Sequence, residues 1–101
     1  MQVLNIKDVY TKLNNGYFLV ASPRDIDTDR DIALAHTIHR HGKFLYWRNY
    51  GSSANDNTIK GLNFILETIF DKDKYYMLMT QKEYYDACNR YYEEERKNEN
   101  V

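Results

Sequence analysis

Alternating hydrophobic and polar residues form two runs in the middle of the chain, and these runs meet at His41-Gly42. Alternation over several residues predicts a half-buried strand, and glycine at the second position of a tight turn accepts a positive φ without a Cβ clash. The sequence therefore predicts a β-hairpin from Ile32 to Tyr50 with a two-residue turn. In this register Arg40 faces Lys43, and Gly51-Ser52-Ser53 closes the hairpin.

The two faces of the predicted hairpin differ in composition. One face is mainly apolar, with charges only at the tip, and we expect it to pack on the core. The other face gathers aromatic, basic and small side chains, and its candidate binding residues are His39, Phe44, Tyr46, Arg48 and Tyr50. If this face is open to solvent, its rings and guanidinium group can stack on a partner. If the Tyr-rich C-terminal helix covers it, the same residues belong to the core.

Capping residues and apolar spacing predict the elements that precede the hairpin. Asn5 can cap a first helix, which ends at Asn14-Asn15-Gly16 because glycine accepts the left-handed conformation at a helix C-terminus. The segment Tyr17 to Ser22 is apolar on both faces, which predicts a strand in the centre of the sheet. Pro23 ends this strand, and we expect Arg24 to Asp31 to form a charged loop.

The last third of the chain is predicted to hold two helices and one strand. Asn55 or Asn57 can cap a second helix that has a broad apolar face. Tyr75 to Met79 is a short apolar run between charged residues, and we interpret it as a strand rather than an extended connector. Thr80-Gln81-Lys82-Glu83 is a capping box and starts a third helix. We expect the polar end of that helix to fray from about residue 94.

These elements predict one α+β domain over residues 1–101. It has an N-terminal helix, a three- to four-stranded mainly antiparallel sheet with a central hairpin, and two C-terminal helices. The single Cys88 cannot form an internal disulfide, and no charged-then-apolar leader opens the chain, so we expect a cytoplasmic location. No apolar run approaches the roughly 20 residues that span a bilayer, so we expect a soluble protein without a membrane partner.

Charge and tyrosine content narrow the classes of partner. The net charge of −1 excludes both a broad basic footprint for nucleic acid and the dense acidity of a DNA mimic. The chain holds ten tyrosines, a residue that concentrates in protein-binding surfaces because it joins a rigid ring to a hydroxyl group. In a small domain several of these tyrosines also cap the core.

Candidate metal ligands fall in two groups. Asp25, Asp27, Asp29 and Asp31 alternate as oxygen ligands for Ca²⁺ do, but an EF-hand loop needs glycine at its sixth position and glutamate at its twelfth. We interpret the four aspartates as a solvated loop and as secondary binding candidates. The histidines at 36 and 39 point to opposite faces of the hairpin, so they cannot converge on one ion. The sequence therefore predicts no metal site.

No residue pattern of a known catalytic site is present either. Cys88 lies in the middle of a predicted helix, where nothing lowers the pKa of a thiol, and we expect it to be buried. The chain has no serine elbow, no phosphate-cradling glycine loop and no paired-carboxylate motif. We therefore expect no catalytic residues and no cofactor, and we favour a protein that is not an enzyme.

The order of elements resembles that of the small single-domain accessory proteins of phages and mobile elements, including anti-CRISPR proteins and other inhibitors of host defence. One group of small anti-CRISPR proteins has a short N-terminal helix, a three-stranded antiparallel sheet and C-terminal helices, and segments 5–15, 17–50, 57–70 and 81–95 follow this order. The resemblance implies a non-catalytic inhibitor that occludes the site of a host defence protein in the host cytoplasm.

Three functions follow from these observations in order of preference. The first is a small protein-binding module, plausible as an inhibitor, whose partner is another protein. The alternative is RNA or single-stranded DNA binding through the aromatic and basic hairpin face. The second alternative is a small metal-dependent or ligand-binding enzyme. Self-association into a homo-oligomer is compatible with each of these functions.

The capping box at the start of the third helix yields the first testable prediction. Thr80→Ala is expected to lower the free energy of unfolding by about 1 kcal/mol, because the helix loses a hydroxyl acceptor for an unpaired backbone N–H. Urea unfolding followed by circular dichroism measures this change. Thr80→Ser keeps the hydroxyl and serves as the control, so an equal loss in both variants would contradict the capping role.

Overall fold

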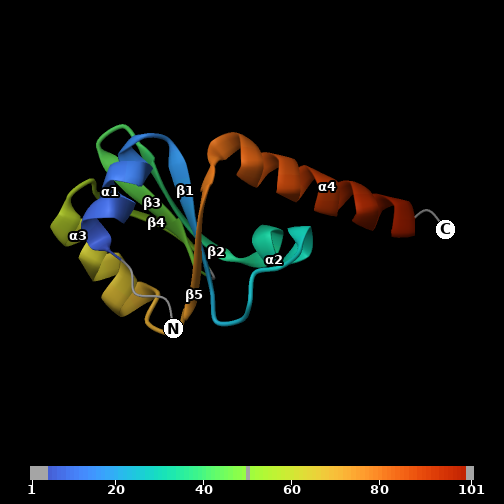
Figure 1. Cartoon of the computed structure of the whole chain (residues 1–101), viewed down its shortest axis with the longest axis horizontal. Coiled ribbons are helices and arrows are strands. Elements are labelled where there is room, and N and C mark those ends of the chain that lie inside the picture. Colours follow the sequence, from blue (N-terminus) through green and yellow to red (C-terminus); the bar gives the residue numbers. More distant parts are fainter. Residues whose placement is uncertain (1–4, 50, 100–101) are drawn as a thin grey trace.

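In the computed structural model, which describes residues 5–49 and 51–99, a five-stranded antiparallel sheet carries helices on both of its faces (Figure 1). The strand order is β4-β3-β2-β1-β5. In chain order the elements are α1 (Ile6–Asn14), β1 (Tyr17–Ser22), α2 (Asp29–Leu34), β2 (His36–His41), β3 (Phe44–Arg48), β4 (Ser52–Asp56), α3 (Ile59–Phe64), the π-helical turn η1 (Ile65–Ile69), β5 (Tyr75–Thr80) and α4 (Gln81–Glu99). The predicted α+β class is confirmed, but the sheet has more strands than the three or four predicted.

The first helix and strand confirm the sequence prediction. The Asn5 side chain accepts hydrogen bonds from the backbone N–H groups of Lys7 and Asp8, at 3.1 and 3.3 Å. Gly16 follows the helix with a φ of +87°, the left-handed conformation that a Cβ makes costly. β1 then spans Tyr17–Ser22 and lies between β2 and β5.

The hairpin turn lies one residue later than predicted. His41 pairs with Phe44, so Gly42 and Lys43 form the two-residue loop, and Gly42 has a φ of +62°. The tight turns that join antiparallel strands have a positive φ at their first position, and glycine adopts it there without a Cβ clash. Arg40 therefore faces Leu45 instead of Lys43. The sum of the two paired residue numbers changes by two, an even number, so the side chains of β2 and β3 stay on the faces that the sequence predicted.

The first part of the predicted hairpin is helical, so this prediction was wrong for residues 32–35. The Thr28 hydroxyl accepts from the backbone N–H of Asp31, and the Asp31 carboxylate accepts from the backbone N–H of Thr28. This capping box starts the short helix α2 inside the segment predicted as a charged loop. β2 begins only at His36, after α2 has ended at Leu34.

A strand that the sequence did not predict lies at one edge of the sheet. Residues 52–56, expected to close the hairpin and lead into a helix, form β4 and pair with β3 from Arg48↔Ser52 to Phe44↔Asp56. The segment is polar and mostly exposed, so backbone pairing rather than burial stabilises it. The following helix is capped by the Thr58 hydroxyl and not by an asparagine.

The last strand and the last helix begin where the sequence predicts. β5 pairs with β1 along its whole length, from Tyr17↔Thr80 to Ser22↔Tyr75. The Thr80 hydroxyl and the Glu83 carboxylate accept from each other's backbone N–H groups, at 3.1 and 3.0 Å, and start α4. This helix continues to Glu99, past the position where the sequence predicts a frayed tail, and it projects away from the sheet (Figure 1).

Two clusters of buried side chains lie on opposite faces of the sheet. The larger cluster joins α1, α3 and η1 to the sheet, and the smaller one joins α2 and α4 to β1 and β5. The members of the smaller cluster are Phe18, Val20, Ala33, Ala35, Met79, Tyr84 and Cys88. On this second face the helices cover β1 and β5 but leave β3 and β4 open. No helix within the described ranges is long and apolar enough to cross a membrane.

The position of Gly42 generates the second prediction. Gly42→Val is expected to lower the free energy of unfolding by about 1–2 kcal/mol, because a β-branched residue resists the left-handed conformation. Thermal unfolding measures the change. Gly51→Val is the matched control, since Gly51 lacks a positive φ and a Cβ there meets no atom within 4 Å. Equal stability of the two variants would show that the turn does not depend on glycine.

Candidate functional site

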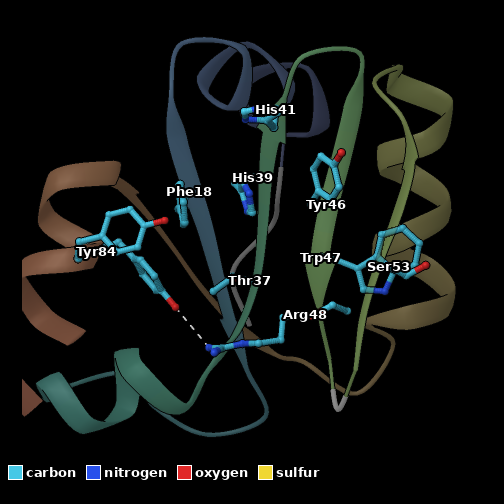
Figure 2. Close-up of a pocket in the computed structure, with 11 residues that line it drawn as sticks. Phe18, Thr37, His39, His41, Tyr46, Trp47, Arg48, Ser53 and Tyr84 are labelled. Carbon is cyan, nitrogen blue, oxygen red and sulfur yellow. Dashed lines mark hydrogen bonds between the residues drawn. The ribbon is translucent and has the colours of Figure 1, made fainter. Parts of the chain in front are cut away.

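A groove of about 410 Å³ lies on the open part of the sheet, between β2, β3, β4 and the first turn of α4 (Figure 2). Its side chains come from β1 to β4 and from α4. The lining residues are Phe18, Thr37, His39, His41, Tyr46, Trp47, Arg48, Ser52, Ser53, Tyr84 and Tyr85. The groove is therefore built by segments from both ends of the chain.

The sheet register places three rings in one row across the strands. Leu19 pairs with Ile38, which brings Phe18 next to His39, and His39 pairs with Tyr46. The Phe18 and His39 rings stack with centroids 4.6 Å apart and planes at 10°. The His39 and Tyr46 rings follow at 5.8 Å and 21°. The hydrogen-bonded strands thus hold a stack of nearly parallel rings.

α4 extends this stack with two tyrosines. The Tyr84 ring lies 4.9 Å from the Phe18 ring, and the Tyr85 ring meets Phe18 edge-on at 5.8 Å. At the other end Phe44 contacts Tyr46 edge-on at 6.3 Å. Phe18 and Tyr84 are buried, whereas Phe44, Tyr46 and Tyr85 are 45, 37 and 46% exposed. A single aromatic network therefore runs from the core to solvent.

Arg48 links the groove to both helices on this face. One terminal nitrogen, Nη2, donates to the carbonyl oxygens of Ala33 and Ala35 at 3.2 and 2.9 Å, and to the Tyr84 hydroxyl at 3.3 Å. The two carbonyls lie at the C-terminal end of α2, where the backbone carries partial negative charge. Within the described chain, the Nε and Nη1 atoms of Arg48 make no hydrogen bond. The guanidinium group is held in place but keeps donors for another group.

Two titratable rings of the groove have shifted pKa values. Burial raises the pKa of the Tyr84 phenol to about 12, although the charge of Arg48 opposes this rise. Burial, together with the nearby His41, lowers the pKa of His39. The His39 Nδ1 atom is buried and has no hydrogen-bond partner among the described residues. His39 therefore contributes an aromatic face and not a positive charge.

Charge in the groove is of one sign. No aspartate or glutamate is among the lining residues, and Arg48 is the one permanently charged side chain that lines it. The groove combines aromatic rings, the hydroxyl groups of Thr37 and Ser52, and one guanidinium group. This arrangement can bind a flat apolar group that carries a negative charge at one side.

Four of the five residues predicted to form the binding face lie together on this side of the sheet. They are His39, Phe44, Tyr46 and Arg48. Tyr50 lies outside the described residues. The structure also answers the question of whether the C-terminal helix covers the face. α4 packs on Phe18 and leaves Tyr46 and Phe44 exposed, so one end of the face is core and the other is open.

Sequence reasoning missed Phe18, Tyr84 and Tyr85 as groove residues. Phe18 was expected in a central strand, and the two tyrosines were expected only as part of the Tyr-rich last helix. A signal was present, because tyrosines at the very start of α4 remain close to the end of β5 and hence to the sheet. No local pattern, however, showed on which face of the sheet that helix would pack.

The four aspartates predicted as secondary candidates do not share one site. Asp29 forms a two-fold ion pair with Arg90, with N–O distances of 2.9 and 3.0 Å, and this hydrogen bonding lowers the pKa of Asp29. The Asp31 carboxylate caps α2, and its bond to the backbone N–H of Asp27 lowers its pKa most. Asp25 and Asp27 are exposed. Two of the four thus stabilise the placement of α2.

Metal ligands are not gathered elsewhere in the described chain. No group of three or more His, Cys, Asp or Glu side chains in these residues could hold a metal ion. His36 lies against Asp73, with its Nδ1 atom 2.8 Å from a carboxylate oxygen, and its ring contacts Phe70 of the larger cluster. His39 stacks on the opposite face of the sheet. Cys88 is buried in the smaller cluster.

Comparison of the chain with protein-family models, with curated proteins and with solved structures gave no match. The groove and its chemistry are therefore the basis for assigning a function.

The hydrogen bonds of Arg48 generate the third prediction. Arg48→Ala is expected to lower the free energy of unfolding by about 1–2 kcal/mol, because the carbonyls at the end of α2 and the Tyr84 hydroxyl lose a charged donor. Urea unfolding measures the loss. Arg40→Ala is the matched control, since Arg40 is exposed and, among the described residues, donates only to the carbonyl of Gly42. If both substitutions were neutral, Arg48 would not join the two helices.

Proposed function

We propose that this protein is a small non-catalytic binding module that docks on a partner protein through the aromatic groove. The observation that carries the proposal is the aromatic network. The exposed rings of Tyr46 and Tyr85 line the groove, Phe44 contacts Tyr46 edge-on, and buried rings support them. Aromatic residues that are rigidly held and partly exposed supply most of the binding energy in many protein interfaces.

The state of the groove residues supports binding rather than catalysis. A general base or nucleophile needs a pKa near the working pH and an unblocked atom. The Tyr84 phenol has a pKa of about 12 and accepts a hydrogen bond from Arg48, while the His39 Nδ1 atom is buried. These groups serve as contact surface and as structural links.

The charge of the groove favours a protein over a nucleic acid. A site for single-stranded nucleic acid follows the phosphate backbone with several positive charges. Arg48 is the one permanent cation among the lining residues, and the chain has a net charge of −1. RNA or single-stranded DNA is the second candidate partner, because rings on adjacent strands can also stack with bases.

The inhibitory part of the proposal has a different basis. The order of elements along the chain resembles that of small phage and mobile-element proteins that inhibit host defence. On this basis the module occludes a functional surface of a host defence protein in the host cytoplasm. A rigid groove with a preformed aromatic rim suits this role, because little conformational entropy is lost on binding.

The fourth prediction tests the binding face. Tyr46→Ala is expected to weaken partner binding by about thirtyfold, the effect of losing an interface residue worth about 2 kcal/mol. The measurement is affinity capture from cell extract with nuclease, followed by titration of the purified partner. Phe64→Ala is the matched control, because Phe64 is a 51% exposed aromatic residue on α3.

Two results would contradict this proposal. Equal binding by wild type and Tyr46→Ala, with Phe64→Ala impaired, would place the interface on α3. Loss of the partner on nuclease treatment, with an affinity that falls steeply and log-linearly with salt, would identify a nucleic acid. Both variants are first checked for an unchanged melting temperature, so that unfolding is not mistaken for lost binding.

A further inference from the structure

The row of rings at the groove favours a flat occupant. The large rings of Phe18, His39 and Tyr46 form one row across the sheet, and the next row consists of Thr37, Arg48 and Ser52. Thr37 and Ser52 are small and the Arg48 side chain extends toward α2 and Tyr84, so a hollow lies beside the row of rings (Figure 2). Its volume of about 410 Å³ lies in the range of about 300–1,000 Å³ that is common for ligand pockets.

The position of Arg48 adds a requirement for charge. Its Nη2 atom is held by two carbonyl groups and by Tyr84, so the plane of the guanidinium group is set before any ligand arrives. The Nε and Nη1 donors remain unpaired within the described chain, and no acidic side chain lines the groove to neutralise them. A carboxylate is an anionic acceptor that fits such a free guanidinium donor.

The number of positive charges in the groove favours a single carboxylate over the phosphate backbone of a nucleic acid. Burial lowers the pKa of His39, which favours its neutral form, and Arg48 is the one permanently charged side chain that lines the groove. A single guanidinium group complements one anionic group beside an aromatic ring, whereas a strand of nucleic acid brings a phosphate with every base. A protein segment in which an aromatic residue lies next to an acidic one supplies one ring and one negative charge.

From this geometry we infer that the partner inserts into the groove an aromatic side chain that has an aspartate or glutamate next to it. The ring stacks on Tyr46, at the exposed end of the ring stack, and the carboxylate accepts a hydrogen bond from one of the unpaired donors of Arg48, Nε or Nη1. The inference rests on the proposed function and specifies the part of the partner that is recognised. It also predicts that the recognised segment lies on an exposed loop or terminus, because the groove receives a protruding side chain.

Small probes test this inference without knowledge of the partner. N-acetyl-tyrosine carries a ring and a carboxylate, and N-acetyl-tyrosinamide is the same molecule without the charge. In ¹H–¹⁵N NMR titrations of the full chain, both are expected to shift the amide signals of residues 37–48 and 84–85. The acid is expected to bind about fivefold more tightly than the amide, because it adds one partly solvated ion pair. Adenosine monophosphate is the third probe.

Substitutions test whether Arg48 causes the preference for the acid over the amide. Arg48→Gln keeps a donor for the α2 carbonyls but removes the charge, so it is expected to bind acid and amide equally. Tyr46→Ala is expected to weaken both probes. Arg40→Gln, which changes a charge on the opposite side of β2, is the control and is expected to keep the fivefold preference.

Three outcomes would overturn the inference. They are equal binding of acid and amide by the wild-type protein, tighter binding of adenosine monophosphate than of the acid, and shifts confined to residues outside the groove. Each of these outcomes leaves the proposed function standing if Tyr46→Ala still loses the partner protein. Conversely, a clear acid preference with no effect of Tyr46→Ala on partner capture would contradict the proposed function and not the chemistry of the groove.

Discussion

Burial of β1 on both of its faces is the constraint on which the rest of the structure depends. Leu19 and Ala21 are fully buried on the side of α1 and α3, and Phe18 and Val20 are buried on the side of α2 and α4. A strand that is apolar on both faces must have neighbours on both edges and helices above and below it. On the second face α2 is short and α4 leaves the sheet after its first turns (Figure 1), so this cover ends at β2. The groove is the boundary between the covered and the open part of one sheet face.

Arg48 and the ring stack give this boundary a defined shape. Arg48 comes from the open strand β3 and holds both the end of α2 and the first turn of α4, so the groove wall cannot move independently of its floor. The ring stack crosses the same boundary from buried Phe18 to exposed Tyr46. A ligand that stacks on the exposed end therefore meets rings whose rotamers are already set by packing, which lowers the entropy lost on binding.

Local signals in the sequence determined most of the elements. Asn5, Gly16 and the capping box at Thr80 each act on backbone groups within one helical turn, so their effect is readable without knowledge of the fold. Alternation likewise determined which side of the sheet His39 and Tyr46 occupy, and the later position of the turn did not change this. The capping box at Thr28 is also a local signal. The alternating pattern that follows it favoured a strand, so α2 was not predicted.

Only the tertiary structure decided the extent of the sheet and the form of the site. β4 is a polar edge strand that forms because β3 provides a backbone partner. The side chains of β4 do not by themselves predict a strand. Whether the aromatic face is open depended on where α4 packs, and that brought Tyr84 to Phe18 and Arg48 across long stretches of chain. The physical reason is that periodicity reveals which face of an element is apolar, whereas the identity of the element that covers this face depends on the path of the whole chain.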